Sequence, residues 1–420
     1  MSGLPDVLVV GGGAIGVSCA FELASRGASV TLLERGGELG WGCSAGNAGL
    51  IAVSHATPLA NPAALRDGLR WMWKADSPFY LRPRPAVMPW LARFVAASTP
   101  ERARASALVI RRLSSASMAL HAELDRAGID TGFARRGSLN VFSTEGQFEA
   151  GRHEAAESAR NGVEARLLHG AEVAELEPAV QSSPAGAVFY PGDAHCEPLR
   201  FVQSVGRAAI GAGAQVRTRV EVLGVRRRAG RAESLVTTAG ELAASTVVLA
   251  TGAWTPSLAK GLGLYLPVEG GKGYHIDLES NSADPKLPVW LQGDRVIATP
   301  LAGRLRLAGT LELSGLDLRV NGRRVDAIRS AAARGLYGLD GRRAVEVWRG
   351  LRPCSPDGVP IIGAAESIPG LVIATGHGML GLTLAPITGR LVAEIVACEQ
   401  PSHDLAPLRP ERFQPLLGRD

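Results

Sequence analysis

The chain has 420 residues, of which 46% are hydrophobic and 20% are charged, and this balance excludes a disordered or coiled-coil protein. Its length corresponds to roughly two or three domains of ordinary size, so a small binding module is excluded as well. The 45 basic and 40 acidic residues are interleaved along the chain, so we expect no nucleic-acid partner.

The cysteines and the apolar segments indicate the compartment. Five cysteines without a C-x-x-C pair argue against a disulfide framework and a structural zinc site, and no other metal-ligand spacing stands out, so we predict no metal. The N-terminus lacks a basic region and a cleavage site for secretion. The longest apolar stretch, Leu371–Ile387, is interrupted by glycines and Pro386 and falls short of the ~20 residues of a membrane span. We expect a cytoplasmic protein, with peripheral contact at the inner face of the cell membrane left open.

The first elements in chain order predict a β-α-β unit. Asp6–Val10 is an apolar strand candidate, Ala14–Arg26 has helical spacing, and Ser29–Leu33 is a second strand candidate. Between the first strand and the helix, Gly11–Gly16 reads GGGAIG, a G-x-G-x-x-G turn that lets the backbone and the helix N-terminus approach a pyrophosphate. Glu34 closes the second strand, roughly 20 residues after the first glycine, where a carboxylate can hold ribose hydroxyls.

Two later segments favour FAD over NAD, which this turn alone does not distinguish. Gly42–Gly49 (GCSAGNAG) is a run of small residues with one amide, suited to close approach by an extended cofactor. Val248–Trp254 (VLATGAW) adds a strand that ends in a tight turn. We therefore predict FAD as the cofactor.

The remaining pattern indicates two interleaved architectures. Pro62 to about Gly162 is mostly helical, with a long amphipathic stretch at Glu101–Ala127. The α/β pattern returns near Pro198 and again from Leu371, whereas Leu264–Leu313 alternates as antiparallel strands do.

The predicted fold class is α/β: a Rossmann-type FAD-binding domain with a second substrate domain built on an antiparallel sheet plus helices. Both domains are expected to be discontinuous. The FAD-binding domain is expected to comprise residues 1–80, 165–262 and 345–420, and the substrate domain residues 81–164 and 263–344.

Four motif blocks, taken in order, resemble the FAD-dependent D-amino-acid oxidase superfamily, and within it the branch of bacterial D-amino-acid dehydrogenases, which is also similar to glycine oxidase and glyphosate oxidoreductase. These blocks are Ser44–Gly49, Lys272–Tyr274, Trp348–Pro353 with Pro356–Gly358, and Thr375–Gly378. With the N-terminal glycine turn and the C-terminal Asp404–Leu405 and Pro410–Phe413, the resemblance covers nearly the whole chain.

The resemblance implies a set of FAD-binding positions. Those implied for the pyrophosphate and the adenosine are Gly11, Gly13, Ala14, Ile15, Gly16, Glu34, Arg35 and Val222. Those implied for the flavin side are Ser44, Asn47, Ala48, Gly252, His377, Gly378, Met379, Leu380 and Thr383. The segment His377–Thr383 would bring main-chain N–H groups and a helix start to the N1/C2 edge of the ring, where the reduced flavin carries negative charge.

Three residues are expected at the substrate. Arg352 resembles the arginine that clamps a substrate carboxylate through two parallel charge-assisted hydrogen bonds. Tyr274 could close over the substrate, although an aromatic residue in an alternating strand is equally a core residue, and His55 could touch the substrate or the flavin or be structural. Some glycine-oxidase-like members carry a basic residue where Met379 stands, which argues against glycine as the preferred substrate.

The predicted reaction is oxidative deamination of an amino acid, either a D-amino acid or a cyclic D-imino acid such as hydroxyproline or proline, by hydride transfer from Cα to flavin N5. Alternatives are oxidation of an N-substituted glycine of the sarcosine or glyphosate type, and an FAD subunit of a hetero-oligomeric opine or hydroxyproline dehydrogenase. The sequence leaves open whether O₂ or a quinone accepts the electrons, whether the flavin is covalently attached, and whether the chain forms an oligomer.

Overall fold

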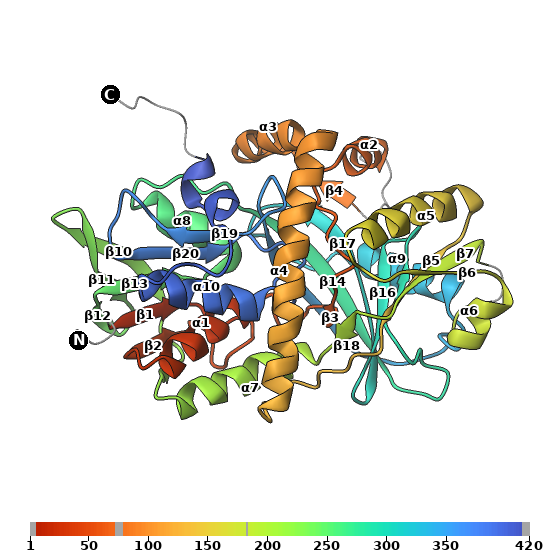
Figure 1. Cartoon of the computed structure of the whole chain (residues 1–420), viewed down its shortest axis with the longest axis horizontal. Helices are drawn as coiled ribbons and strands as arrows, with labels where there is room; N and C mark the ends of the chain where they lie inside the picture. The colour runs from red at the N-terminus through yellow and green to blue at the C-terminus, as the bar shows by residue number, and fades with distance from the viewer. Residues whose placement is uncertain (1–5, 72–78, 182–183, 414–420) are drawn as a thin grey trace.

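The computed structural model describes residues 6–71, 79–181 and 184–413 and is organised around two main sheets (Figure 1). The first is a six-stranded sheet of order β19-β20-β13-β1-β2-β9. Its strands are β1 (Val7–Val10), β2 (Val30–Leu33), β9 (Gln215–Arg217), β13 (Thr246–Leu249), β19 (Ile361–Ala364) and β20 (Leu371–Thr375). All neighbours are parallel except β19 and β20.

The centre of the six-stranded sheet is buried on both faces, which explains its short, largely apolar strands such as β1 (VLVV) and β13 (TVVL). One face is covered by α1 (Ala14–Ser25), which packs between α7 (Pro198–Gly211) and α10 (Ala385–Val396). The other face packs against a meander whose strands are β10 (Val222–Arg228), β11 (Arg231–Thr237) and β12 (Gly240–Ala243). The predicted β-α-β unit is confirmed.

The second sheet has nine strands in the order β18-β14-β17-β16-β15-β5-β7-β6, with β4 beside β17. They are β4 (Phe79–Leu81), β5 (Ser138–Phe142), β6 (Arg166–Leu168), β7 (Gly186–Tyr190), β14 (Glu269–Glu279), β15 (Val289–Leu291), β16 (Val296–Leu301), β17 (Arg304–Leu313) and β18 (Ala344–Cys354). β14 to β17 are antiparallel to their neighbours in this set, as the alternating pattern predicts. The helix α9 (Gly322–Gly335) packs on this sheet.

The remaining elements belong to neither of the two main sheets. They are β3 (Leu50–Ile51), β8 (Ala194–His195), α2 (Pro62–Trp71), α3 (Met88–Ala97), α4 (Pro100–Arg126), α5 (Glu145–Arg160), α6 (Ala171–Leu176), α8 (Thr255–Lys260) and four single turns of 3-10 helix at Pro85–Val87, Gly252–Trp254, Ala406–Leu408 and Pro410–Phe413. No helix among the described residues is both long and apolar enough to cross a membrane.

Where the two domains divide stays a prediction, and sheet membership departs from the predicted segments at three places. β6 and β7 lie in the nine-stranded sheet, although residues 165–262 were assigned to the FAD-binding domain. β18 lies there too, although the segment from 345 was assigned to that domain. Conversely, α4 packs on α10 beside the six-stranded sheet. Periodicity shows the type of an element but not its partner, so it does not predict which sheet a strand joins.

The 27-residue helix α4 stands between the two sheets (Figure 1). His121 on its buried face places Nε2 3.2 Å from the carbonyl oxygens of Leu382 and Thr383, just before α10. Because carbonyl oxygens only accept, Nε2 carries the hydrogen. Burial, opposed by these hydrogen bonds, lowers the pKa of His121 to about 4, so this histidine is neutral at pH 7 and ties α4 to the turn that precedes α10.

Gly389 allows α10 to lie directly on α1. A Cβ at this position would overlap the backbone of Ser18. We expect Gly389→Ala to destabilise the protein by about 1–3 kcal/mol through overpacking, despite the better helix propensity of alanine. Thermal unfolding followed by circular dichroism measures this. The control is Gly211→Ala at the end of α7, where a Cβ meets open space; equal melting temperatures for the two variants would contradict the close approach.

His121 makes stability depend on pH. Its folded pKa of about 4 lies below the ordinary value of about 6.5, so the unfolded chain binds the proton more readily, and stability falls as pH drops from about 6.5 towards 4. Glutamine does not titrate, so His121→Gln serves as the reference. Relative to this variant, the free energy of unfolding of the wild type should fall by about 2 kcal/mol between pH 7 and pH 5. Urea unfolding of both proteins at the two pH values tests this; a pH-independent difference in unfolding free energy would refute it.

Candidate active site

A cavity of about 1180 Å³ brings together residues that lie more than 300 positions apart in the sequence. Its wall combines the loop after Gly42, the strands β17 and β18, and the turn before α10. The predicted site residues in this wall are Asn47, Ala48, His55, Arg352, Gly378, Met379, Leu380 and Thr383. Such a volume exceeds the ~300–1,000 Å³ of ordinary small-ligand pockets, so it can hold a large cofactor ring together with a substrate.

The predicted phosphate-binding turn has the geometry that a pyrophosphate requires. Gly11 has φ +108°, and a Cβ there would press on the carbonyl oxygen of Ala250. A Cβ at Gly16 would overlap the carbonyl oxygen of Gly11. Only glycine fits these two positions, because the strand end and the first helical turn approach each other closely. Gly13 is the N-cap of α1, so Ala14 and Ile15 lie in its first turn.

Glu34 is oriented by the same turn. Its Oε2 accepts the N–H of Gly12 (2.6 Å) and its Oε1 the N–H of Gly36 (2.7 Å). Each carboxylate oxygen has a second acceptor site, so ribose hydroxyls can still be bound. Arg35 lies next in sequence, with its guanidinium carbon 4.0 Å from the ring centroid of Trp254, a cation–π contact.

Two further predicted positions are Gly252, which follows β13 of the six-stranded sheet, and Val222, which lies in the meander that packs on that sheet. Gly252, with φ +55°, begins the 3-10 turn that follows β13. Val222 is the first residue of β10 and is partly exposed. The chain just before it is held near Glu34, because the N–H of Val220 donates to the Glu34 carbonyl oxygen (3.0 Å). These placements are compatible with the adenosine end of a dinucleotide.

The loop Ser44–Asn47 connects the phosphate-binding turn with the cavity. The Ser44 hydroxyl accepts the N–H of Ala14 at 2.9 Å. Asn47 accepts the N–H of Gly49 through Oδ1 (2.8 Å) and donates from Nδ2 to the Met379 carbonyl oxygen (3.4 Å). The loop therefore spans from the N-terminus of α1 to the turn that precedes α10.

That turn presents main chain rather than charge. His377 places Nε2 2.9 Å from the hydroxyl of Thr388, which itself donates to the Leu384 carbonyl oxygen (2.8 Å); Nε2 of His377 is therefore the donor. Burial lowers the pKa of His377 to about 3, so the ring is neutral. Gly378 follows with φ +54° and donates its N–H to the Pro353 carbonyl oxygen (2.8 Å).

Arg352 on β18 lies in the cavity wall, partly buried. Its side chain lies over Gly273 of β14, where a Cβ would overlap the guanidinium. Nη1 donates to the carbonyl oxygen of Thr310 at 2.6 Å, and a guanidinium has five N–H donors. Because this bond uses one N–H donor of Arg352, other donors of its guanidinium can bind a planar anion such as a carboxylate.

His55 is a neutral residue of the same wall. Its ring centroid lies 3.9 Å from that of Trp290. Burial, reinforced by the positive charge of Arg295, lowers its pKa to about 3. The buried carboxylate of Asp193 holds the preceding residues by accepting from the N–H of Val53 (2.9 Å) and the hydroxyl of Ser54 (2.6 Å), a role that the sequence pattern did not reveal.

Tyr274 does not line the cavity, so the predicted closure over the substrate is not supported. Its ring belongs to the buried core of the nine-stranded sheet. Its hydroxyl lies 3.2 Å from Oε2 of Glu312 and accepts the N–H of Asn321 (3.3 Å). The physical reason is the two-residue period of a strand: Gly273 faces the cavity, so its neighbour faces the other side.

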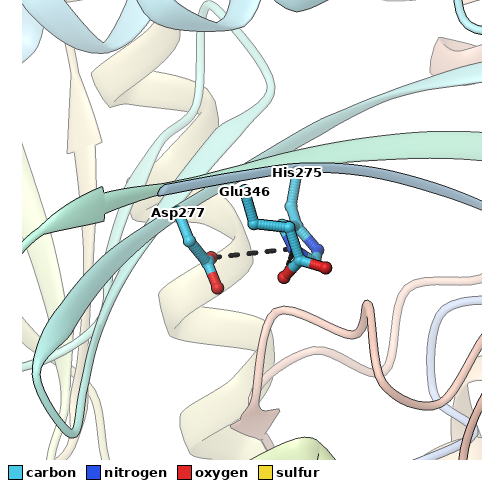
Figure 2. Close-up of side chains that lie close together, drawn as sticks. All are labelled: His275, Asp277 and Glu346. Atoms are coloured by element: carbon cyan, nitrogen blue, oxygen red, sulfur yellow. Dashed lines mark hydrogen bonds and ion pairs between the residues drawn. The ribbon is translucent and has the colours of Figure 1, made fainter. Parts of the chain in front are cut away.

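A cluster of polar side chains beside the cavity, of which His275 and Asp277 are buried and Glu346 is exposed, is absent from the sequence-based predictions. His275, Asp277 and Glu346 extend from the neighbouring strands β14 and β18 towards one another (Figure 2). One ligand atom of each lies within 4.8 Å of the others, a grouping that could hold a metal ion. The only sequence signal was polar residues at alternate positions of a strand that otherwise reads as core.

Two arginines form ion pairs with Asp277, the central residue of this cluster. Arg306 donates to both oxygens of Asp277 at 2.8 Å, and Nε of Arg304 lies 2.9 Å from Oδ2. Burial by itself would raise the pKa of Asp277, but the hydrogen bonds and charge of Arg306 outweigh it and hold the pKa below its usual value. A metal cation would compete with two guanidinium groups here, so the geometry favours an ion-pair network over a metal centre.

Comparison with known proteins is consistent with this geometry. Residues 6–395 match the family described as FAD dependent oxidoreductase, DAO. The chain is 33% identical to a D-amino acid dehydrogenase of Paramagnetospirillum magneticum over 98% of this chain and 99% of that one, and 34% identical to one of Methylobacterium nodulans over 94% and 96%. Among solved structures, glycine oxidase from Geobacillus kaustophilus is 27% identical, with a TM-score of 0.77 over 98% of this chain and 99% of that one.

These matches confirm the predicted resemblance and the predicted fold class. The family match extends through both main sheets and through every element that lines the cavity. The chain therefore belongs to the DAO family of FAD-dependent oxidoreductases.

Proposed function

We propose that this protein oxidises the Cα–N bond of a free amino acid, with FAD as the electron acceptor and Arg352 as the anchor of the substrate carboxylate. The observation that carries the proposal is the position of Arg352, whose guanidinium lies in one cavity wall with Asn47, Ala48 and the turn at 378–383. The relatives named D-amino acid dehydrogenase support an amino acid of D configuration.

The chain has residues suited to each part of the FAD molecule, from the adenosine to the flavin. The turn Gly11–Gly16 and the N-terminus of α1 would hold the pyrophosphate, and Glu34 would hold the ribose. Asn47 of the loop Ser44–Asn47 and the turn at 378–383, which lie together in the cavity wall, would hold the flavin end. When bound, FAD supplies an acceptor for the hydride that leaves the substrate carbon.

The residues of the chain contribute mainly by positioning. A guanidinium that binds the carboxylate through two hydrogen bonds fixes both the location and the rotation of the substrate. His55 is uncharged near pH 7, since its pKa is about 3, and is therefore a weak proton acceptor. We propose that it shapes the wall and hydrogen-bonds the substrate, and that the substrate enters with a neutral amine.

The cavity favours an amino acid with a side chain over glycine. Its volume of about 1180 Å³ leaves space beyond a flavin ring, and apolar residues such as Trp90, Phe94 and Leu311 line one part of it. Met379, also in the wall, adds no positive charge that would bind a second anionic group. A D-amino acid or a cyclic D-imino acid fits this wall better than a small N-substituted glycine.

Anaerobic flavin bleaching tests the substrate class. We expect the ~450 nm absorbance of FAD bound to the purified protein to be lost on adding D-amino acids or D-proline. L-enantiomers, glycine and sarcosine serve as the comparison set. Bleaching confined to sarcosine or glycine would replace the proposal with N-substituted glycine oxidation, and no bleaching by any amino acid would refute it for the isolated chain. Opening the cuvette to air then shows whether O₂ restores the colour.

Arg352 should be indispensable for substrate binding but not for FAD binding. Two charge-assisted hydrogen bonds contribute several kcal/mol, so Arg352→Ala should lower kcat/KM by about 100-fold or more, and Arg352→Lys, which keeps the charge without the fork, by less. Arg349→Gln is the matched control, since Arg349 is exposed on the same strand and donates to the Leu318 carbonyl oxygen. An equal loss in the control, or none in Arg352→Ala, would rule out the carboxylate clamp.

A further inference from the structure

A row of charged side chains on β17, β14 and β18 of the nine-stranded sheet lies beside the loop Ser44–Asn47, and its members Arg306 and Asp277 are buried. Asp277 on β14 lies opposite Arg306 of β17 on one side and opposite Glu346 of β18 on the other. Arg306 and Asp277 are 3% and 2% exposed. Charges buried to this degree are costly unless they are paired and fully hydrogen-bonded, so the partners of each donor matter.

Arg306 divides its donors between the sheet and the loop. Nε and Nη2 each donate to one oxygen of Asp277 at 2.8 Å. Nη1 donates to the carbonyl oxygens of Ala45 (2.7 Å) and Asn47 (2.8 Å). Because the guanidinium is planar and rigid, the two bonds to Asp277 determine where Nη1 points. Asp277 thus aims Arg306 at the loop.

His275 holds the carbonyl group between these two. Its Nδ1 lies 3.3 Å from the carbonyl oxygen of Gly46, and its ring stacks on Trp348 with centroids 5.3 Å apart and planes 8° apart. A Cβ on Gly46 would overlap the ring of Trp348. Three consecutive carbonyl groups of the loop are therefore bound by the sheet, and the loop packs flat against it.

From these contacts we propose that Arg306, aimed by Asp277, is a positioning residue for the cofactor: it holds the loop Ser44–Asn47 in the shape that binds FAD. The same loop is bonded to two other parts of the proposed FAD site: Ser44 accepts the N–H of Ala14 at the start of α1, and Asn47 donates to the Met379 carbonyl oxygen in the turn before α10. This inference rests on the proposed function, because it takes FAD to be the ligand.

Arg304 provides a matched control for the charge of the cluster. It also contacts Asp277, through Nε at 2.9 Å, but its Nη2 donates to Oε2 of Glu197 (2.6 Å) and its Nη1 to the Ala302 carbonyl oxygen (3.4 Å). Its described contacts do not include the loop. Arg304→Gln removes a cation from Asp277 and leaves the loop contacts intact, whereas Arg306→Gln removes both.

The experiment is a titration of apoprotein with FAD, read by visible absorbance and by quenching of flavin fluorescence, for the wild type, Arg306→Gln, Arg306→Lys and Arg304→Gln. We expect Arg306→Gln to raise the Kd for FAD at least tenfold and to change the shape of the bound flavin band. Arg306→Lys, which keeps the charge but cannot reach Asp277 and both carbonyl groups together, should show a smaller rise. Arg304→Gln should bind FAD with the wild-type Kd and spectrum.

Two results would overturn the inference. One is wild-type FAD affinity and spectrum in both Arg306 variants; if circular dichroism shows that Arg306→Gln does not fold, Arg306→Lys alone decides. The other is an equal loss of affinity in Arg304→Gln, which would indicate a general effect of the cluster charge. Failure of the wild type itself to bind FAD would refute the proposed cofactor, and this outcome is distinct because it does not depend on any variant.

Discussion

The loop Ser44–Asn47 is held between two sheets that have no strand in common. On one side its Ser44 hydroxyl binds the first turn of α1, which the six-stranded sheet supports, and on the other side Arg306 of the nine-stranded sheet binds its carbonyl groups. Neither sheet alone determines the loop's conformation. Beside the loop, the turn before α10 is joined directly to β18, the strand of Arg352, because the Gly378 N–H donates to the Pro353 carbonyl oxygen.

Holding the loop from the nine-stranded sheet requires buried charged side chains, whose desolvation costs free energy. Ion pairs between these side chains offset that cost. Asp277 is bound by two arginines, and in the same sheet Glu312 lies 2.9 Å from the ammonium group of Lys272. Such pairs add little net stability compared with apolar packing, but losing one partner is expensive. They therefore select one strand register, and we interpret Lys272 and Tyr274, part of a family-like motif, as structural residues.

Two histidines near the cavity, His55 and His377, are kept neutral by burial. His55 and His377 have pKa values of about 3, so neither adds a titrating positive charge near the flavin end. The guanidinium of Arg352 in the cavity wall is the group proposed to bind the substrate carboxylate. A site of this kind controls where a substrate lies, while the cofactor supplies the electron chemistry.

The sequence by itself determined the parts that depend on local pattern: the glycine turn with Glu34, the alternating strands and the helix α4. The role proposed for Arg352 comes from the resemblance of its motif to that of the family. Which strands pair, which face a residue occupies and which distant groups meet were decided by the tertiary structure. The side chain of Tyr274 lies in the core because its neighbour Gly273 faces the cavity. Arg306 met Asp277 and the loop only because β14 and β17 pair in one register, and register follows from the packing of the whole sheet, not from the pattern of either strand.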